Sequence, residues 1–273
     1  MTRVPLTPQG IPLMGMGTWP LQGAECVRAV CMAMEVGFRH IDSAQMYGNE
    51  RETGEAIASS GLRREEVFIV SKVSPDNVSP ARFMDSVENS LVDLKVSWVD
   101  LFLIHWPPRQ DFEGVVARLN ETMDRGLARR IGVSNFTIAQ IEKAQALSNG
   151  RLVNVQVEFQ PLLDQSRVKA TAERLGMCLS AYSPLGRGIV LKEPVIAGIA
   201  SRLGRPPSEI ALRWIIQQGV VAIPMTTKRE NAKSNLRALD FSLSEEDMAS
   251  IAALNLQNRR LISPAAWAPE WDN

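Results

Sequence analysis

Three stretches of the chain share one pattern: residues 37–43 read GFRHIDS, residues 61–72 read GLRREEVFIVSK, and residues 126–135 read GLARRIGVSN. In each stretch, a glycine precedes a short apolar run that favours a strand. Glycine suits the left-handed position just past a helix, so each glycine predicts the end of one helix before the next strand. Six such boundaries predict six alternations of helix and strand. The other three lie at residues 150–158, 176–183 and 219–224.

Two further apolar runs bring the number of expected strands to eight. These runs are mostly apolar rather than alternating, which is typical of a parallel sheet covered by helices on both faces. Eight parallel strands close most simply into a TIM barrel, so we predict an α/β protein of the (β/α)8 class. The expected strands are residues 14–18, 38–43, 67–72, 99–105, 131–135, 153–158, 177–183 and 220–224.

Segments outside the strands carry helix and turn signals. Apolar residues recur at helical spacing between positions 27 and 34, and Ser79-Pro80 reads as an N-cap followed by proline at the first helical position. Prolines and a glycine near the start of the chain predict an N-terminal hairpin. Further helices over 206–218 and 244–255, with the tail 263–273, predict an outer layer and a short C-terminal cap.

The whole chain, residues 1–273, is predicted to form a single domain. Barrels of this kind often reach this length as one unit, and no linker or low-complexity tract divides the chain. A doubly wound open sheet is the structural alternative, but it usually carries a phosphate-binding G-x-G-x-x-G motif. Residues 15–20 read GMGTWP and lack the third glycine.

Charge and composition exclude several classes of function. Thirty Lys and Arg residues balance thirty Asp and Glu residues, so no net field attracts nucleic acid or an anionic membrane. No apolar stretch approaches the roughly 18 residues of a membrane span. Three cysteines, and a start without the apolar core of a signal peptide, favour the cytoplasm. We expect a monomer that binds a small-molecule substrate and no metal. Packing is the expected role of Cys26, Cys31 and Cys178, with a reactive thiol as the alternative.

Several of the expected strands end in polar residues. In barrel enzymes the active site lies at the carboxyl ends of the strands. Asp42 ends the second strand, Lys72 the third and His105 the fourth. Because the carboxyl ends of barrel strands meet at one rim, an acid, a cation and an imidazole could converge there. A buried lysine needs a partner, and Asp42 on the neighbouring strand is the obvious one. Taken alone, this pair is equally consistent with a purely structural ion pair.

Tyr47 shifts the balance toward catalysis. The chain has only two tyrosines and two histidines, and one of each, Tyr47 and His105, lies at or just past a strand end. A phenol is a poor acid with an ordinary pKa of about 10, but a neighbouring ammonium stabilises its phenolate and is expected to bring that pKa closer to the working range. Tyr47 with Lys72 behind it is therefore a candidate proton donor. Such a donor fits carbonyl reduction, in which an incoming hydride creates an alkoxide that needs a proton.

Residues 37–50, GFRHIDSAQMYGNE, resemble the signature of the aldo-keto reductase family. Four later segments resemble the family's later motifs in the same order: DLFLIHWP at 100–107, IGVSNF at 131–136, VQVE at 155–158 and AYSPLG at 181–186. The short loops are similar to those of the small bacterial diketogluconate and methylglyoxal reductases. The resemblance implies an oxidoreductase that reduces small aldehydes or ketones to alcohols by hydride transfer from NADPH. Methylglyoxal, short aldehydes, keto-acids and keto-sugars are the implied substrates.

The resemblance also implies a role for each matched residue of the catalytic group. Tyr47 matches the family's general acid. Lys72 and Asp42 match the pair that tunes its pKa, and His105 matches the residue that orients the carbonyl group.

A second set of residues is implied to bind the cofactor. Ser134, Asn135 and Gln156 match the contacts to the nicotinamide carboxamide, and Tyr182 matches the aromatic residue that stacks on the ring. Ser134 and Asn135 have another interpretation, as an ordinary cap between a strand and a helix. Thr18 and Trp19 are further candidates. The pyrophosphate clasp is implied at Ser183, Leu185, Gly186 and Arg187.

The adenosine end departs from the family pattern. Family members that select NADPH usually carry Lys-Ser after the Ile-Pro of the eighth strand and an Arg five residues past that Ser; Met225, Thr226 and Asn231 stand at these positions. Lys228 and Arg229 lie in the same turn, at an expected helix N-terminus, and could bind a 2′-phosphate instead. A solvated basic loop is the alternative. We predict NADPH as the cofactor, with NADH as the second choice. The remaining predicted contacts are Thr226, Thr227 and Asn235.

Aromatic side chains are candidates for the walls of the substrate site. Ligand pockets are commonly lined by apolar and aromatic side chains around a few polar groups. The loop after His105 is short and so is the tail, so short aldehydes or keto-acids suit the site better than steroids. The candidate wall residues are Trp19, Met46, Trp106, Trp267 and Trp271.

Two functions from other classes stay open. A barrel aldolase would use Lys72 to form a Schiff base with a carbonyl substrate, and Asp42, which would keep Lys72 charged, argues against it. A non-catalytic NADP(H)-binding sensor, like the potassium-channel β-subunits that share this signature, would need a partner interface that the sequence does not identify.

Overall fold

The computed structural model describes residues 4–272, and its centre is a sheet of eight strands in the order β1 to β8. All neighbouring strands are parallel. The sheet closes where Met14 bridges Ala222 and the Gly17 N–H donates to the Pro224 carbonyl at 3.0 Å. The predicted (β/α)8 barrel is therefore confirmed. The strands are β1 (Met16–Gly17), β2 (His40–Asp42), β3 (Phe68–Val73), β4 (Leu101–Ile104), β5 (Ile131–Ser134), β6 (Leu152–Glu158), β7 (Cys178–Tyr182) and β8 (Val221–Ile223).

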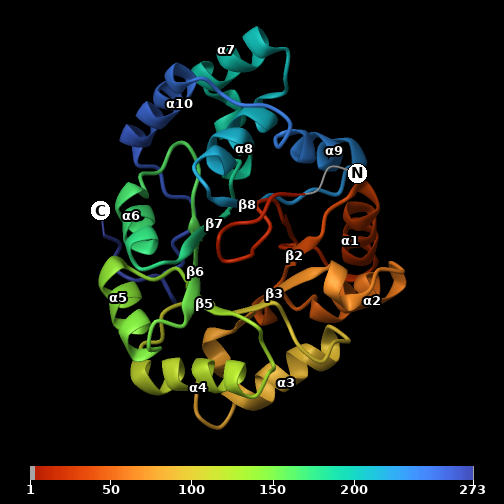
Figure 1. The fold of residues 1–273 in the computed structure, drawn as a ribbon, viewed down its shortest axis with the longest axis vertical. Coiled ribbons are helices and arrows are strands. Elements are labelled where there is room, and N and C mark those ends of the chain that lie inside the picture. Colours follow the sequence, from red (N-terminus) through yellow and green to blue (C-terminus); the bar gives the residue numbers. More distant parts are fainter. Residues whose placement is uncertain (1–3, 273) are drawn as a thin grey trace.

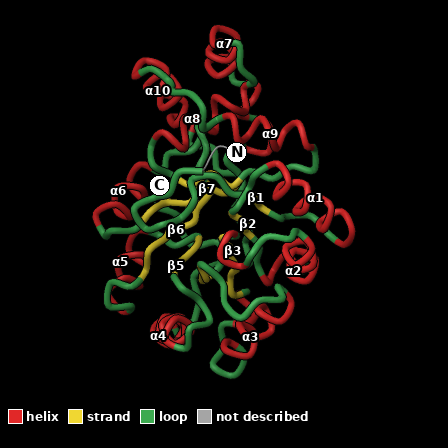
Figure 2. The backbone as a smooth tube through the Cα atoms, turned by 45° about the vertical axis from the view of Figure 1, so that its right-hand side comes forward, coloured by secondary structure: helices red, strands yellow, loops and turns green. Residues whose placement is uncertain are grey.

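Helices alternate with the strands and form a ring outside them (Figures 1 and 2). The boundary glycines act as predicted: Gly37 ends α1 with a φ of 125°, and its N–H donates to the Ala33 and Met34 carbonyls. A side chain would strain this backbone conformation. The helices are α1 (Gly23–Val36), α2 (Glu50–Ser59), α3 (Phe83–Asp93), α4 (Phe112–Asp124), α5 (Ile138–Leu147), α6 (Ser166–Arg174), α7 (Pro194–Leu203), α8 (Pro207–Gln217), α9 (Arg229–Arg237) and α10 (Glu245–Ala252). Short 3-10 turns lie at η1 (Gln45–Tyr47), η2 (Arg64–Glu66), η3 (Pro75–Asn77), η4 (Gly186–Gly188), η5 (Val190–Lys192) and η6 (Ala253–Gln257).

The N-terminal segment forms the predicted hairpin and packs against the barrel interior through the fully buried Ile11. Leu6 and Pro12 form an antiparallel bridge, and the Gln9 amide donates to the Gly176 carbonyl just before β7. The first strand is shorter than the expected 14–18 because Met14 pairs with β8 whereas Met16 pairs with β2. The segment is thus shared between two neighbouring strands.

One predicted helix boundary is wrong. The helix expected to start at Ser79-Pro80 begins at Phe83. Residues 79–82 form a turn in which the Ser79 carbonyl accepts the N–H groups of Arg82 and Phe83. Local turn hydrogen bonds therefore delay the start of α3.

The apolar core has two layers, and its arrangement leaves one end of the barrel polar. The larger layer lies between the strands and the helices. The smaller fills the barrel interior, with residues such as Val70 and Leu103 that precede Lys72 and His105 along their strands. Polar groups are consequently placed at the carboxyl ends of the strands. Within residues 4–272, no helix is both long and apolar enough to cross a membrane.

Candidate active site

The Asp42–Lys72 pair predicted from the strand ends is present and buried. β2 and β3 lie side by side, with Asp42 opposite Val70. The Lys72 ammonium donates to Asp42 Oδ1 at 2.6 Å and to the Ser43 carbonyl at 2.7 Å, and the lysine side chain is fully buried. Burial lowers the pKa of Lys72, but the charges of Asp42 and Tyr47 more than offset this, so the net pKa is raised. The lysine is therefore held as a cation.

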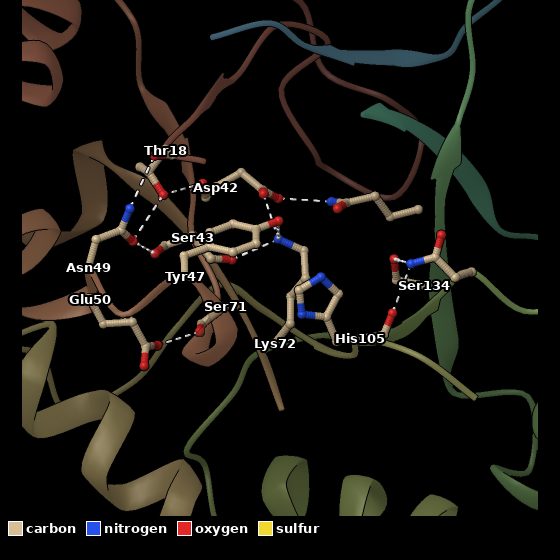
Figure 3. Close-up of polar contacts among 12 residues, drawn as sticks. Thr18, Asp42, Ser43, Tyr47, Asn49, Glu50, Ser71, Lys72, His105 and Ser134 are labelled. Atoms are coloured by element: carbon tan, nitrogen blue, oxygen red, sulfur yellow. Dashed lines mark hydrogen bonds and ion pairs between the residues drawn. The ribbon is translucent and has the colours of Figure 1, made fainter. Parts of the chain in front are cut away.

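Tyr47 completes this group from the turn η1, which follows β2. Its hydroxyl lies 3.5 Å from the Lys72 Nζ, and Figure 3 shows the side chains of Asp42, Tyr47 and Lys72 converging, with His105 beside them. Burial raises the pKa of Tyr47 above 10; Lys72 acts in the opposite direction, and Asp42 adds to the rise. The expectation that Lys72 brings the Tyr47 pKa toward neutrality is thus outweighed by desolvation. At neutral pH the phenol carries its proton.

Two amide side chains that sequence reasoning missed hold the turn of Tyr47 in place. The Gln45 amide donates to Ser90 Oγ at 3.0 Å and accepts from the Ser74 N–H at 2.9 Å. Asn49 is fully buried and donates to the Thr18 carbonyl at 3.1 Å. Both residues lie inside the GFRHIDSAQMYGNE segment, so their position in the signature was the only available signal.

His105 lies at the end of β4, against the Tyr47 ring at a centroid distance of 5.5 Å. Burial, and secondarily the charge of Lys72, holds the pKa of His105 well below 6.5, so its imidazole is neutral at pH 7. The buried Nδ1 has no hydrogen-bond partner within residues 4–272. An orphaned lone pair costs less than an orphaned N–H, which favours the proton on Nε2.

The predicted nicotinamide contacts form a second cluster on neighbouring strands. The Asn135 amide donates to the His105 carbonyl at 2.9 Å and to Ser134 Oγ at 3.1 Å, and the Tyr182 hydroxyl donates to Asn135 Oδ1 at 2.6 Å. The alternative role as a helix cap is wrong for Ser134 and Asn135, because Thr137 caps α5 with a capping box. Gln156 lies across the barrel, and its amide donates to Asp42 Oδ2 at 2.8 Å.

The predicted pyrophosphate clasp is a tightly turned loop after β7. Ser183, Gly186 and Arg187 all have a positive φ, between 48° and 54°, and Leu185 between them has a φ of −99°. Such alternation can turn backbone N–H groups toward one side, as in the nests that bind anions. Here Pro184 has no N–H and the Gly186 N–H donates to the Ser183 carbonyl at 2.9 Å, so the N–H groups of Leu185 and Arg187 remain for the predicted anion. Arg187 is exposed.

The C-terminal tail is fixed beside this loop by Glu158, at the end of β6. Its carboxylate accepts the N–H groups of Leu261 and Ile262, the latter at 2.8 Å. Burial raises the pKa of Glu158, and these two N–H groups lower it. Glu158 therefore fastens the tail to the barrel rim, a role that sequence reasoning did not identify.

At the predicted adenosine end, Lys228 is the N-cap residue of α9 and Arg229 its first residue, as expected. Arg229 is already engaged, because its guanidinium pairs with Glu35 from the last turn of α1. Lys228 is exposed and forms no ion pair with any residue between 4 and 272. Thr226 accepts the N–H of Lys228 at 3.1 Å, Thr227 is exposed, and Asn235 is buried within α9.

Two of the predicted substrate walls pack against catalytic side chains, Trp19 against the Tyr47 ring and Trp106 against the His105 ring. Trp19 is 52% exposed, and its ring centroid lies 5.5 Å from that of Tyr47. Trp106 is buried and packs against Trp271 of the tail, with 6.4 Å between the ring centroids. Met46 lies in η1 beside Tyr47, and Trp267 is partly buried in the tail after Pro264. The Thr18 hydroxyl is buried inside the fold and lies 3.2 Å from the Asp42 carbonyl and 3.3 Å from Asn49 Oδ1, either of which can accept its single proton.

Comparison with known proteins agrees with this geometry. Residues 13–256 match the model of the aldo/keto reductase family. The chain is 41% identical to a protein of Escherichia coli O157:H7 named methylglyoxal reductase DkgB, over 96% of this chain and 99% of that protein. A solved structure assigned to 2,5-diketo-D-gluconic acid reductase B is 41% identical, with a TM-score of 0.95 over 98% of this chain and 96% of that chain. The aldose reductase structure from Schistosoma japonicum is 27% identical, with a TM-score of 0.91 over the full length of both chains.

Proposed function

Since the chain belongs to the aldo/keto reductase family, we propose that it reduces small aldehydes or ketones to alcohols with NADPH, and that Tyr47 donates the proton. The family and the named relatives already indicate that the chain is an oxidoreductase that acts on carbonyl groups. One observation carries the finer proposal: a buried line of contacts runs from Asp42 through Lys72 to the Tyr47 hydroxyl at the rim.

Each member of this group has a distinct part in proton donation. The Tyr47 phenol is protonated at neutral pH, so it can give its proton to a developing alkoxide. The Lys72 ammonium, 3.5 Å away, then stabilises the phenolate that remains. Asp42 keeps Lys72 charged and fixed. The neutral His105, with its proton on Nε2, would orient the carbonyl oxygen toward Tyr47.

Aldo-keto reductases generally use NADP(H), and the residues around the strand ends fit such a cofactor. When bound, the nicotinamide supplies the hydride. Ser134, Asn135 and Gln156 offer amide and hydroxyl groups for its carboxamide, and Tyr182 offers a ring face. The loop of residues 183–187, with the N–H groups of Leu185 and Arg187, suits the pyrophosphate. Lys228, which forms no ion pair within residues 4–272, offers a cation for the 2′-phosphate, whereas Arg229 would first have to leave Glu35.

The alternative of an aldolase is not supported by the surroundings of Lys72. A Schiff base needs a neutral, accessible amine. The Lys72 Nζ is buried, donates to Asp42 and Ser43, and is held as a cation. Borohydride treatment in the presence of a carbonyl substrate should therefore leave the protein unmodified.

The substrates that we propose are methylglyoxal, short aldehydes, keto-acids and keto-sugars. The name of the Escherichia coli relative supports methylglyoxal, and the ring of Trp19 beside Tyr47 gives a small apolar wall. Consumption of NADPH and of NADH should be followed by absorbance against a panel of these compounds. Turnover with several of them would support the reductase. Cofactor binding without turnover of any would favour the non-catalytic sensor.

We also propose that the protein acts as a monomer in the cytoplasm. Its balanced charge gives no field for nucleic acid or membrane. Size-exclusion chromatography with light scattering should give the mass of one chain, and a stable mass of two chains would contradict the proposal.

A further inference from the structure

Gln156 makes a contact that its predicted role in carboxamide binding does not require. Its amide nitrogen reaches across the barrel from β6 to β2 and donates to Asp42 Oδ2 at 2.8 Å. Both side chains are buried, with Gln156 only 2% and Asp42 only 3% exposed. A hydrogen bond to a carboxylate in such surroundings is strong, because no water competes for either partner.

The two oxygens of Asp42 are therefore used by different donors. Oδ1 accepts from the Lys72 ammonium at 2.6 Å, and Oδ2 accepts from Gln156. Lys72 in turn contacts the Tyr47 hydroxyl at 3.5 Å, and Figure 3 shows the Asp42 carboxylate and the Lys72 ammonium beside the Tyr47 ring. A continuous line of polar contacts thus runs from Gln156 to the predicted proton donor.

We propose that Gln156 is a positioning residue for carbonyl reduction, which fixes Asp42 from across the barrel and sets how strongly Lys72 acts on Tyr47. This inference rests on the proposed function. The amide N–H shares the charge of the carboxylate, so Asp42 cancels less of the Lys72 charge than it would alone. It also fixes the rotation of the carboxylate, so that only one oxygen faces Lys72. Because Gln156 is also a predicted nicotinamide contact, it joins the cofactor site to the proton donor.

Two other roles would leave the same residue in the same place. Gln156 could bind the cofactor without affecting Tyr47, or it could merely fill the barrel interior. Only the positioning role predicts a change in the pH at which the proton donor loses its proton. The alkaline limb of the pH profile of kcat/KM reports that loss in the free enzyme.

The test uses Gln156→Leu, which keeps the bulk of the side chain and removes its N–H. Without the amide, Asp42 cancels more of the Lys72 charge, the phenolate of Tyr47 is less stabilised, and its pKa rises. We expect the pKa of the alkaline limb of kcat/KM for methylglyoxal reduction to rise by at least about half a pH unit.

Asn154→Leu is the matched control. Asn154 is a buried amide of the same strand, but it donates to the Cys178 carbonyl and Ser180 Oγ and does not contact Asp42. The control should keep the parent's pH profile even if its melting temperature falls. NADPH binding, measured by protein fluorescence, is followed in every variant.

Two results would overturn the inference. One is an unchanged alkaline limb in Gln156→Leu, which would make Gln156 a cofactor contact alone if NADPH binding weakens and a filler of the barrel interior if it does not. The other is an equal shift of the limb in Asn154→Leu, which would make the effect one of packing. Failure of the proposed function is distinguishable, because the parent protein itself would then show no reduction of methylglyoxal.

Discussion

The two ends of the predicted cofactor site are built differently. At the nicotinamide end, the Lys72 side chain is fully buried and its ammonium has its acceptors within 3.5 Å. At the adenosine end, the Arg229 side chain is 49% exposed and pairs with Glu35, which is 60% exposed. Water can replace a lost partner in the second region but not in the first.

This difference explains where the chain departs from the family pattern. Asp42, Lys72 and His105 are buried, Tyr47 is half-buried, and all four match the family, whereas the adenosine end lacks the two usual cations. A phosphate at the surface can be bound by any cation within reach, and a lysine on a flexible stem tolerates a change of position. A buried pair has no such freedom, because each charge must meet its partner directly.

Removal of the Tyr47 hydroxyl should have the largest effect. Tyr47→Phe keeps the ring beside Trp19 and His105 but removes the proton donor, so kcat/KM for carbonyl reduction should fall at least about a hundredfold. Steady-state assays of NADPH consumption measure this loss. NADPH binding, followed by fluorescence titration, should be unchanged. Near-normal turnover of the variant would remove Tyr47 from the mechanism.

The buried end also contains an acid whose charge reduces stability. Glu50 accepts hydrogen bonds from Ser71 and Ser90, and burial raises its pKa from 4.5 to about 7. Between these two values the folded state holds more protons than the unfolded state. The free energy of unfolding should therefore decrease as pH rises from about 4.5 to about 7, by roughly 2 to 3 kcal/mol.

Glu50→Gln tests whether the charge of Glu50 lowers the free energy of unfolding. The glutamine amide cannot ionise, but its oxygen can still accept the hydrogen bond from Ser71. Urea denaturation of the variant should show a flatter dependence of the unfolding free energy on pH than the parent. Glu55→Gln, on the exposed side of the same helix, is the control and should keep the parent's slope. Identical slopes in all three proteins would show that another group titrates in this range.

Loss of both cations at the adenosine end should have a smaller and more selective effect. Lys228→Ala combined with Arg229→Ala should weaken NADPH binding about tenfold and leave NADH binding nearly unchanged, because only NADPH carries a 2′-phosphate. Added salt should weaken NADPH binding in the parent but have less effect in the variant. Equal losses for the two cofactors would mean that neither residue contacts the 2′-phosphate.

The smallest expected effect concerns the partner of Arg229. Glu35→Gln frees the guanidinium for a phosphate and should tighten NADPH binding by less than about fivefold, since exposed ion pairs contribute little. NADPH affinity is measured by titration for Glu35→Gln in the parent and for the same change in an Arg229→Ala background. If Glu35 acts by holding Arg229, the gain in affinity should be absent in the second background. A gain of the same size in both backgrounds would show that Glu35 acts without Arg229.

The sequence predicted the candidate site better than it predicted the forces that act there. Asp42, Lys72 and His105 stand out because polar residues end otherwise apolar strands. The direction of the net change in the Tyr47 pKa was wrong, because it depends on how much protein surrounds the phenol. The predicted helix start at Ser79-Pro80 was wrong, because a Ser-Pro pair is as typical of a turn as of a helix N-cap, and α3 begins four residues after Ser79, at Phe83.

The amino-acid sequence by itself determined the barrel and the four residues at its rim, because periodicity, boundary glycines and strand-end residues are local features of a chain. The tertiary structure alone decided which partners those residues meet. Gln156 binds Asp42, Glu158 binds the tail at Leu261, and Arg229 binds Glu35, each across more than 100 positions. Such contacts depend on how the barrel closes and how the tail returns, and hydrogen bonds form only where that closure brings a donor within about 3 Å of an acceptor.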